Sequence, residues 1–173
     1  MLFQSFAKNF GLYGERAGCV SLVSDSSDTR KIVTSRIKQI ARPMYSNPPI
    51  HGARIVDLIL SDEKLTADWH AELKHMSGRM QSMRHGLVDG LKKAGSTHNW
   101  SHITSQIGMF AYTGLSKEQV DKVRETHSIY MTADGRISIA GLNTHNLEYI
   151  ANAFHEVTKW SAYYIKLIFK THH

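Results

Sequence analysis

The sequence QSFAKNFGLYGER occupies residues 4–16, close to the N-terminus. Lys8 lies in it among small and aromatic residues, with Ser5 before it and Arg16 after it. A lysine with apolar neighbours is poorly hydrated as an ammonium, which favours the free amine. A free amine is what Schiff-base chemistry with an aldehyde requires, and a serine hydroxyl and an arginine fork suit a phosphate. From composition alone, an ordinary surface lysine remains the commoner explanation.

Working outward from this stretch, further motifs follow along the chain: RPMYSNPP at 42–49, GARIV at 52–56, NWSHIT at 99–104, QIGMF at 106–110 and GRISIAG at 135–141. Together with the lysine stretch they resemble the class I pyridoxal-phosphate-dependent aminotransferases, and among these the aspartate aminotransferases. The resemblance runs with little interruption from Gln4 to about Trp160. Several separate motifs in the family's order form a specific signal that chance agreement explains poorly.

Composition and charge describe an ordinary globular protein. Of the 173 residues, 42% are hydrophobic and 21% are charged, and no apolar run is long enough to cross a bilayer, so we expect no membrane partner. The single cysteine, Cys19, excludes an internal disulfide and fits a reducing compartment. The net charge of +6 comes from scattered basic residues, so we expect no nucleic-acid partner. The histidines lack a paired ligand spacing, and we expect no metal site.

The resemblance implies an α/β fold class, the C-terminal part of a fold type I pyridoxal-phosphate-dependent transferase. Residues 1–75 are then the remnant of the large, cofactor-binding domain, and residues 76–160 are the small α+β domain. Residues 161–173 depart from the family and form a divergent tail. The family carries further site residues upstream of the lysine, so we expect this chain to be a fragment or a shortened product.

Local patterns predict the elements of the first part. We expect the end of a buried strand at 1–3, a strand at 19–23, a helix at 25–42, and a helix from His51 that buries Ile55, Leu58 and Ile59. A long helix is predicted over 62–94. Its apolar residues recur at spacings of three and four and are expected to lie in a core: Leu65, Trp69, Leu73, Met76, Met80, Met83, Leu87 and Leu91.

Strands and short helices alternate in the last part. Strands are predicted at 106–113, 128–132 and 136–140, the last two separated by a turn at 133–135. Ser116 and Gln119 form a capping box that opens a short helix. The last helix is predicted to begin at Thr144.

The resemblance assigns three residues to the cofactor, pyridoxal 5'-phosphate. Lys8 is the residue that binds the cofactor covalently, and its freed amine carries a proton between the substrate's α-carbon and the cofactor's C4′ carbon. Ser5 and Arg16 hold the phosphate, Arg16 through paired hydrogen bonds.

Three further residues are assigned to the substrates, an amino acid and a 2-oxo acid. Arg136 matches the residue that clamps the α-carboxylate, because a planar fork meets a planar carboxylate. Arg42 matches the residue that reaches into the neighbouring subunit of a homodimer and pairs with the side-chain carboxylate. An arginine there favours aspartate and glutamate as substrates. Phe110 matches a residue lining the pocket, although core packing explains it about equally well.

Three hypotheses follow. The first is an aspartate aminotransferase that transfers an amino group between L-aspartate and 2-oxoglutarate. The second is a related aminotransferase with another substrate, which Arg42 disfavours. The third is a catalytically inactive product that only binds a full-length subunit. Gly14 before Glu15, together with the motif around Arg136, resembles the mitochondrial branch of the family, which favours the mitochondrial matrix over the cytoplasm.

Overall fold

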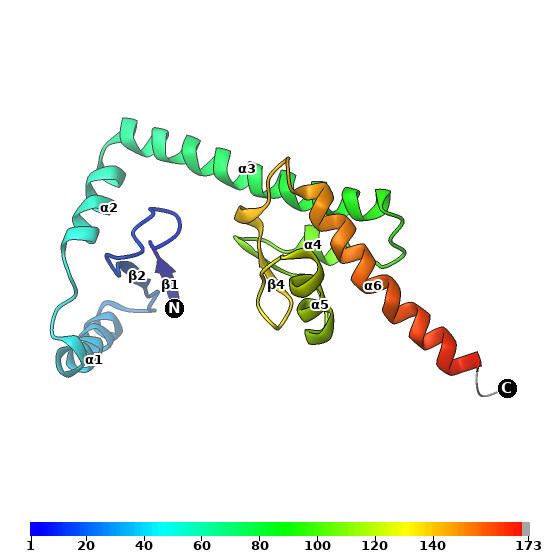
Figure 1. Cartoon of the computed structure of the whole chain (residues 1–173). Helices are drawn as coiled ribbons and strands as arrows, with labels where there is room; N and C mark the ends of the chain where they lie inside the picture. Colours follow the sequence, from blue (N-terminus) through cyan, green and yellow to red (C-terminus); the bar gives the residue numbers. More distant parts are fainter. Residues whose placement is uncertain (171–173) are drawn as a thin grey trace. The chain divides into compact units, whose positions relative to one another are not determined.

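The computed structural model describes the backbone of residues 1–170 and the side chains of residues 1–159 (Figure 1). It divides into two compact units, Met1–Leu73 and Lys74–His173, and the boundary falls within the long helix α3 (Glu63–Lys93). The divergent tail predicted at 161–173 lies outside the residues whose side chains are described. The assignment of 1–75 and 76–160 to a large and a small domain stays a prediction.

The first unit begins with a ribbon of two antiparallel strands, β1 (Leu2–Ser5) and β2 (Gly18–Ser21). Ser5 pairs with Gly18, and the Phe6 amide continues the pairing by donating to the Ala17 carbonyl at 3.1 Å. A β-carbon at Gly18 would lie 2.6 Å from the Gln4 carbonyl oxygen, so the strands approach this closely only with glycine there. The first and last residues of the loop 6–17 therefore lie side by side.

Two helices follow the ribbon. They are α1 (Ser27–Tyr45), capped by the Ser26 side chain, and α2 (His51–Ser61). No residue of α1 is buried. In α2 the buried residues are Gly52 and Val56, which lie one turn apart.

Two burial predictions for the first unit were wrong. The strand at its start exists, but Phe3 is 69% exposed, and Leu58 of α2 is 65% exposed. A β-carbon on Gly52 would meet Glu15 and Ala17, so this turn of α2 approaches the loop closely. Leu58 is offset from Gly52 and Val56 around the helix and lies on another face.

The second unit combines the end of α3 with a second ribbon and three helices. Its elements are α4 (Ser101–Ser105), β3 (Phe110–Tyr112), α5 (Lys117–His127), β4 (Arg136–Ser138), the 3₁₀ turn η1 (Ile139–Gly141) and α6 (Leu147–Lys170). Strands β3 and β4 are antiparallel, with Phe110 opposite Ser138 and Tyr112 opposite Arg136. One apolar cluster joins these elements, and its most buried members include Leu87, Ile103, Val123, Ile139 and Phe154.

The stripe of α3 is a core face only in its C-terminal half. Met83, Leu87 and Leu91 are buried, whereas Leu65 is 39% and Met76 is 45% exposed. The predicted capping box is confirmed, because the Gln119 amide donates to the Ser116 hydroxyl and the Ser116 amide donates to the Gln119 side chain. The apolar pattern of α3 therefore predicts burial correctly only where other elements pack on the helix, whereas the capping box depends on local residues alone.

Four predictions for the second unit differ from the structure, and one of them is the strand expected at 136–140, which ends at Ser138 where η1 begins. The strand predicted over 106–113 is limited to β3, and the preceding residues 101–105 form the helix α4. Residues 128–132 are not a strand, and the Thr132 amide instead closes a turn by donating to the Arg136 carbonyl. The last helix begins at Leu147 because the Asn143 side chain accepts from the His145 and Asn146 amides and holds a separate turn there.

Candidate active site

Aromatic contacts fix the loop that carries Lys8. The ring of Phe10 stacks on Trp69 of α3 with their centroids 4.4 Å apart, and Phe6 meets Phe10 edge to face. The Trp69 indole donates to the Asn9 carbonyl at 2.8 Å. The residues on both sides of Lys8 are thus attached to the first turns of α3, which restricts where the lysine backbone can lie.

A polar contact fixes the far end of the same loop. The Nδ1 atom of His51 lies 3.0 Å from the Oε2 atom of Glu15, at the first residue of α2. Because His51 is largely exposed, solvent screens this pair, and its contribution to stability is small. It nevertheless sets the position of Glu15, the residue directly before Arg16.

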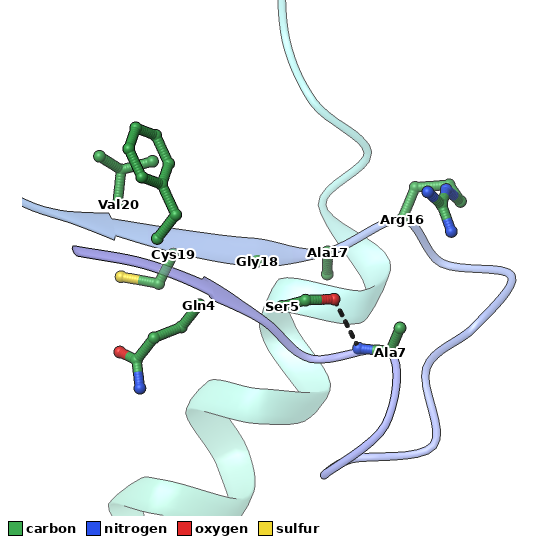
Figure 2. A pocket seen from close by; sticks show the side chains of 9 residues that line it. Gln4, Ser5, Ala7, Arg16, Ala17, Gly18, Cys19 and Val20 are labelled. Atoms are coloured by element: carbon green, nitrogen blue, oxygen red, sulfur yellow. Dashed lines mark hydrogen bonds between the residues drawn. The ribbon is translucent and has the colours of Figure 1, made fainter. Parts of the chain in front are cut away.

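A pocket with a volume of about 370 Å³ lies against the ribbon and is lined by residues of β1, β2 and the two ends of the loop. Ser5 and Arg16 both line it, and Arg16 is the only charged residue among those that do. Figure 2 shows the Ser5 hydroxyl turned toward the Ala7 amide, from which it accepts a hydrogen bond at 3.2 Å. The hydroxyl hydrogen can still be donated to another group. A serine and an arginine therefore line one pocket.

The backbone of Arg16 is in an unusual conformation. Its φ angle is 53°, in the left-handed region that residues with side chains seldom adopt. Its guanidinium donates through Nη1 to the Tyr13 carbonyl at 3.2 Å. This bond uses one of the five donors of the guanidinium, so the others can reach an anion in the pocket.

The Lys8 side chain is exposed, and its amine lies 4.3 Å above the centre of the Tyr13 ring. The face of an aromatic ring attracts an ammonium group. The predicted shielding of this amine by apolar neighbours is not seen, because the Lys8 side chain is exposed.

Arg42 lies at the end of α1 in the first unit. It is exposed, and its guanidinium donates through Nη1 to the Ser46 hydroxyl at 2.7 Å. It shares a shallow hollow with Lys38 and other residues of the same helix, and it does not line the pocket that holds Arg16. The structure thus brings Ser5 and Arg16 to one pocket but leaves Arg42 outside it.

In the second unit, Phe110 and Arg136 begin the two strands of the ribbon. The Arg136 guanidinium lies over the Phe110 ring, 4.9 Å from its centre. This stacking holds the guanidinium against a flat apolar surface. Phe110 is 41% exposed, so core packing alone does not account for this residue.

The turn before Arg136 carries a carboxylate. The Asp134 side chain accepts from the Thr132 hydroxyl and from the Arg136 amide. The Thr132 hydrogen bond lowers the pKa of Asp134, and so do the Arg136 amide and charge. Gly135 has a φ angle of 82°, and a β-carbon there would lie 2.8 Å from the Leu115 carbonyl oxygen, so this turn requires glycine.

The motifs did not indicate the two arginines of α3 that hold this ribbon. Arg84 is 3% exposed and donates to the carbonyls of Ile103, Gly108 and Phe110. Burial lowers the pKa of its guanidinium. Arg79 donates to the Leu142 carbonyl at 2.7 Å. A signal was present, because Arg84 lies four residues after Met80 and three before Leu87 and so shares the apolar face.

Among the described residues, no helix is long and apolar enough to span a membrane. Within the same part of the chain, His, Cys, Asp and Glu side chains do not gather in groups of three or more that could bind a metal ion.

Residues 1–154 match the aminotransferase class I and II family, and the chain belongs to this family. It is 56% identical over 158 residues to the mitochondrial aspartate aminotransferase of Dictyostelium discoideum, across 91% of this chain and 37% of that protein.

Solved structures agree with this relation. A mitochondrial aspartate aminotransferase from Trypanosoma brucei matches 90% of this chain and 41% of its own, with a TM-score of 0.84 and 50% identity. An aromatic-amino-acid aminotransferase from Burkholderia pseudomallei, covalently bound to pyridoxal phosphate, matches 90% of this chain and 39% of its own, with a TM-score of 0.85 and 47% identity. The predicted family and fold class are confirmed, and the chain spans less than half the length of these relatives.

Proposed function

We propose that this chain carries active-site residues of an aspartate aminotransferase. The reaction is the pyridoxal-phosphate-dependent transfer of an amino group between L-aspartate and 2-oxoglutarate, giving oxaloacetate and L-glutamate. The observation that supports it most is the pocket lined by Ser5 and Arg16, formed by the ends of the loop that holds Lys8. The names of the similar proteins support the same reaction.

The residues around this pocket suit pyridoxal 5'-phosphate. Ser5 and Arg16 offer a hydroxyl and a guanidinium to a phosphate, and none of the nine residues lining the pocket is acidic. Lys8, on the loop between them, offers a primary amine to an aldehyde. When bound, the cofactor supplies an electron sink for the bonds at the substrate's α-carbon.

Lys8 and the arginines divide the remaining work. Lys8 would hold the cofactor through its amine, and the same amine, when free, would accept a proton from the substrate's α-carbon. Arg136, oriented by the Phe110 ring, binds the α-carboxylate through two parallel hydrogen bonds. Arg42 binds the side-chain carboxylate, which makes aspartate and glutamate the preferred amino acids. We propose that Arg42 serves the site of a second subunit in a homodimer, and that the protein acts in the mitochondrial matrix, with the cytoplasm as the alternative.

A specific observation supports a second candidate. All residues of β1 and β2 are exposed, including the large apolar side chains of Leu2, Phe3 and Val20. Exposed apolar strands are surfaces on which another chain can pair. The second candidate is therefore an inactive product that binds a full-length subunit.

Borohydride reduction tests the cofactor site, because it fixes the cofactor on the lysine that holds it. The 173-residue chain is mixed with pyridoxal phosphate, reduced, digested and mapped by mass spectrometry. We expect the label on Lys8, and its loss in Lys8→Ala but not in the matched variant Lys31→Ala. A label spread evenly over the surface lysines would contradict the proposal and leave binding to another subunit as the better explanation.

Substrate preference tests the role of Arg42. In the loaded chain, the cofactor's visible band is followed while aspartate or phenylalanine is added. Arg42→Ala should weaken the response to aspartate by about tenfold or more and leave that to phenylalanine nearly unchanged, because a carboxylate loses its partner. Lys38→Ala, in the same hollow, is the control. Equal losses for both amino acids would assign Arg42 to structure and not to recognition.

A further inference from the structure

The outer edge of β3 is completed by side chains in place of a third strand. The carbonyls of Gly108 and Phe110 point to Arg84, which donates to them at 2.9 and 2.8 Å through Nη2. The carbonyl between them, that of Met109, accepts from the Ile139 amide at 2.8 Å on the other side. Alternate carbonyls of a strand point in opposite directions, so Arg84 occupies the side opposite β4.

Arg84 itself is held in one position. Its Nη1 atom donates to the carbonyl of Ile103 in α4 at 2.7 Å, so that three carbonyls surround one planar fork. The residue is 3% exposed, and its flanking turns of α3 contribute Met83, Leu87 and Leu91 to the core. A buried guanidinium with three charge-assisted bonds holds its partners more firmly than a solvated one.

Phe110 connects this anchor to the carboxylate-binding arginine. Its carbonyl is bound by Arg84, and its ring lies under the Arg136 guanidinium at 4.9 Å. Movement of the Phe110 backbone would therefore move the surface against which Arg136 rests. Arg79, one turn earlier on α3, holds the segment after β4 through the Leu142 carbonyl. Both strands of the ribbon are thus anchored to the same helix.

We propose that Arg84 is a positioning residue for carboxylate binding at Arg136, acting through the Phe110 backbone and ring. The proposal rests on the function proposed above for Arg136. A guanidinium held in one orientation loses less conformational freedom when a carboxylate binds, so the anchor raises affinity without touching the ligand. Lysine cannot replace Arg84, because a single ammonium does not reproduce the planar fork.

The test uses the full chain, labelled with ¹⁵N, and the side-chain Nε–Hε resonance of Arg136, which is assigned from its loss in Arg136→Lys. Because the guanidinium lies over the Phe110 ring, we expect the ring current to shift this resonance. We expect Arg84→Lys and Phe110→Leu to move it in the same direction, toward the position of an exposed arginine. Each should weaken 2-oxoglutarate binding by about two- to fivefold, the range of a surface cation–π contact. The double variant should bind 2-oxoglutarate no more weakly than Phe110→Leu does, because both changes act on the same contact between the Phe110 ring and Arg136.

An Arg136 resonance and an affinity that Arg84→Lys leaves unchanged would overturn the proposal, and so would losses that multiply in the double variant. If Arg84→Lys does not fold, Phe110→Leu decides, because it keeps the carbonyl that Arg84 binds and removes only the ring. An unmoved resonance in Phe110→Leu would then overturn the proposal. The resonance is read without cofactor, so a failure of Lys8 labelling is a separate result.

Discussion

Both ribbons of this protein are short antiparallel strand pairs, but their surroundings are opposite. In the first, every residue of β1 and β2 is exposed. In the second, Ala111 of β3 is 0% and Ile137 of β4 is 8% exposed, because helices pack on them in one apolar cluster. A two-stranded ribbon has too little apolar area to be stable alone, so what covers it decides its rigidity. The proposed cofactor residues therefore lie on the less covered region, and the proposed carboxylate clamp lies on the better packed one.

The largest expected contrast comes from removing one apolar side chain from each region. Phe154→Ala empties a fully buried position of α6 and should lower the free energy of unfolding of the second unit by about 3–5 kcal/mol. Ile32→Ala removes a side chain of α1 that is 63% exposed and should change stability by less than about 0.5 kcal/mol. Native-state hydrogen exchange, read by mass spectrometry for each unit, gives both values. Equal losses would mean that α1 is covered in solution.

A smaller contrast is expected from the two serine caps. Ser116 caps α5 within a capping box, and Ser26 caps α1 by accepting from the Thr29 amide at 3.1 Å. Each change to alanine should weaken its helix by about 1 kcal/mol. For Ser116→Ala the loss should appear in the cooperative unfolding of the second unit, whereas for Ser26→Ala it should appear only as faster exchange of α1 amides. A cooperative loss in both variants would show that α1 unfolds together with a core.

The smallest expected effect concerns acid. The Lys117 hydrogen bond lowers the pKa of Asp121, and the Thr132 hydrogen bond lowers that of Asp134, both below the ordinary 3.8. A carboxylate with a lowered pKa in the folded state adds stability above its unfolded pKa and loses it as pH falls through the folded pKa. Unfolding of the second unit should therefore become easier from about pH 4 downward. Asp121→Asn should make this decline shallower, and an unchanged acid profile would contradict the assignment.

Some of these features were predictable because the signal is local. The capping box at Ser116 needs only residues three apart, and the helical stripe of α3 needs only its own periodicity. Burial is different, because it depends on neighbours. Leu58 belongs to an apolar helix pattern and is exposed because the close approach to the loop is at Gly52. Local patterns do not say which face a neighbour covers.

The site was predictable in part for the same reason. The motif around Lys8 identified Ser5 and Arg16, and the structure brings these two to one pocket. The placement of the Lys8 amine over Tyr13 depends on how the loop turns, which the motif does not specify. The sequence pattern does not identify Arg84, because a charged residue within an apolar stripe is expected to interrupt the buried face. Its partners are backbone carbonyls of residues distant in the sequence, which the pattern does not show.

The left-handed backbone of Arg16 bears on how this position would respond to selection. Glycine adopts a φ of 53° without steric cost, and asparagine does so more readily than arginine, so a screen for stability alone should enrich both at position 16. A screen for phosphate binding should retain arginine, because neither replacement carries a charge. The two screens would then favour different residues at position 16. The residue that survives both screens would show whether one anion contact offsets the backbone strain of arginine there.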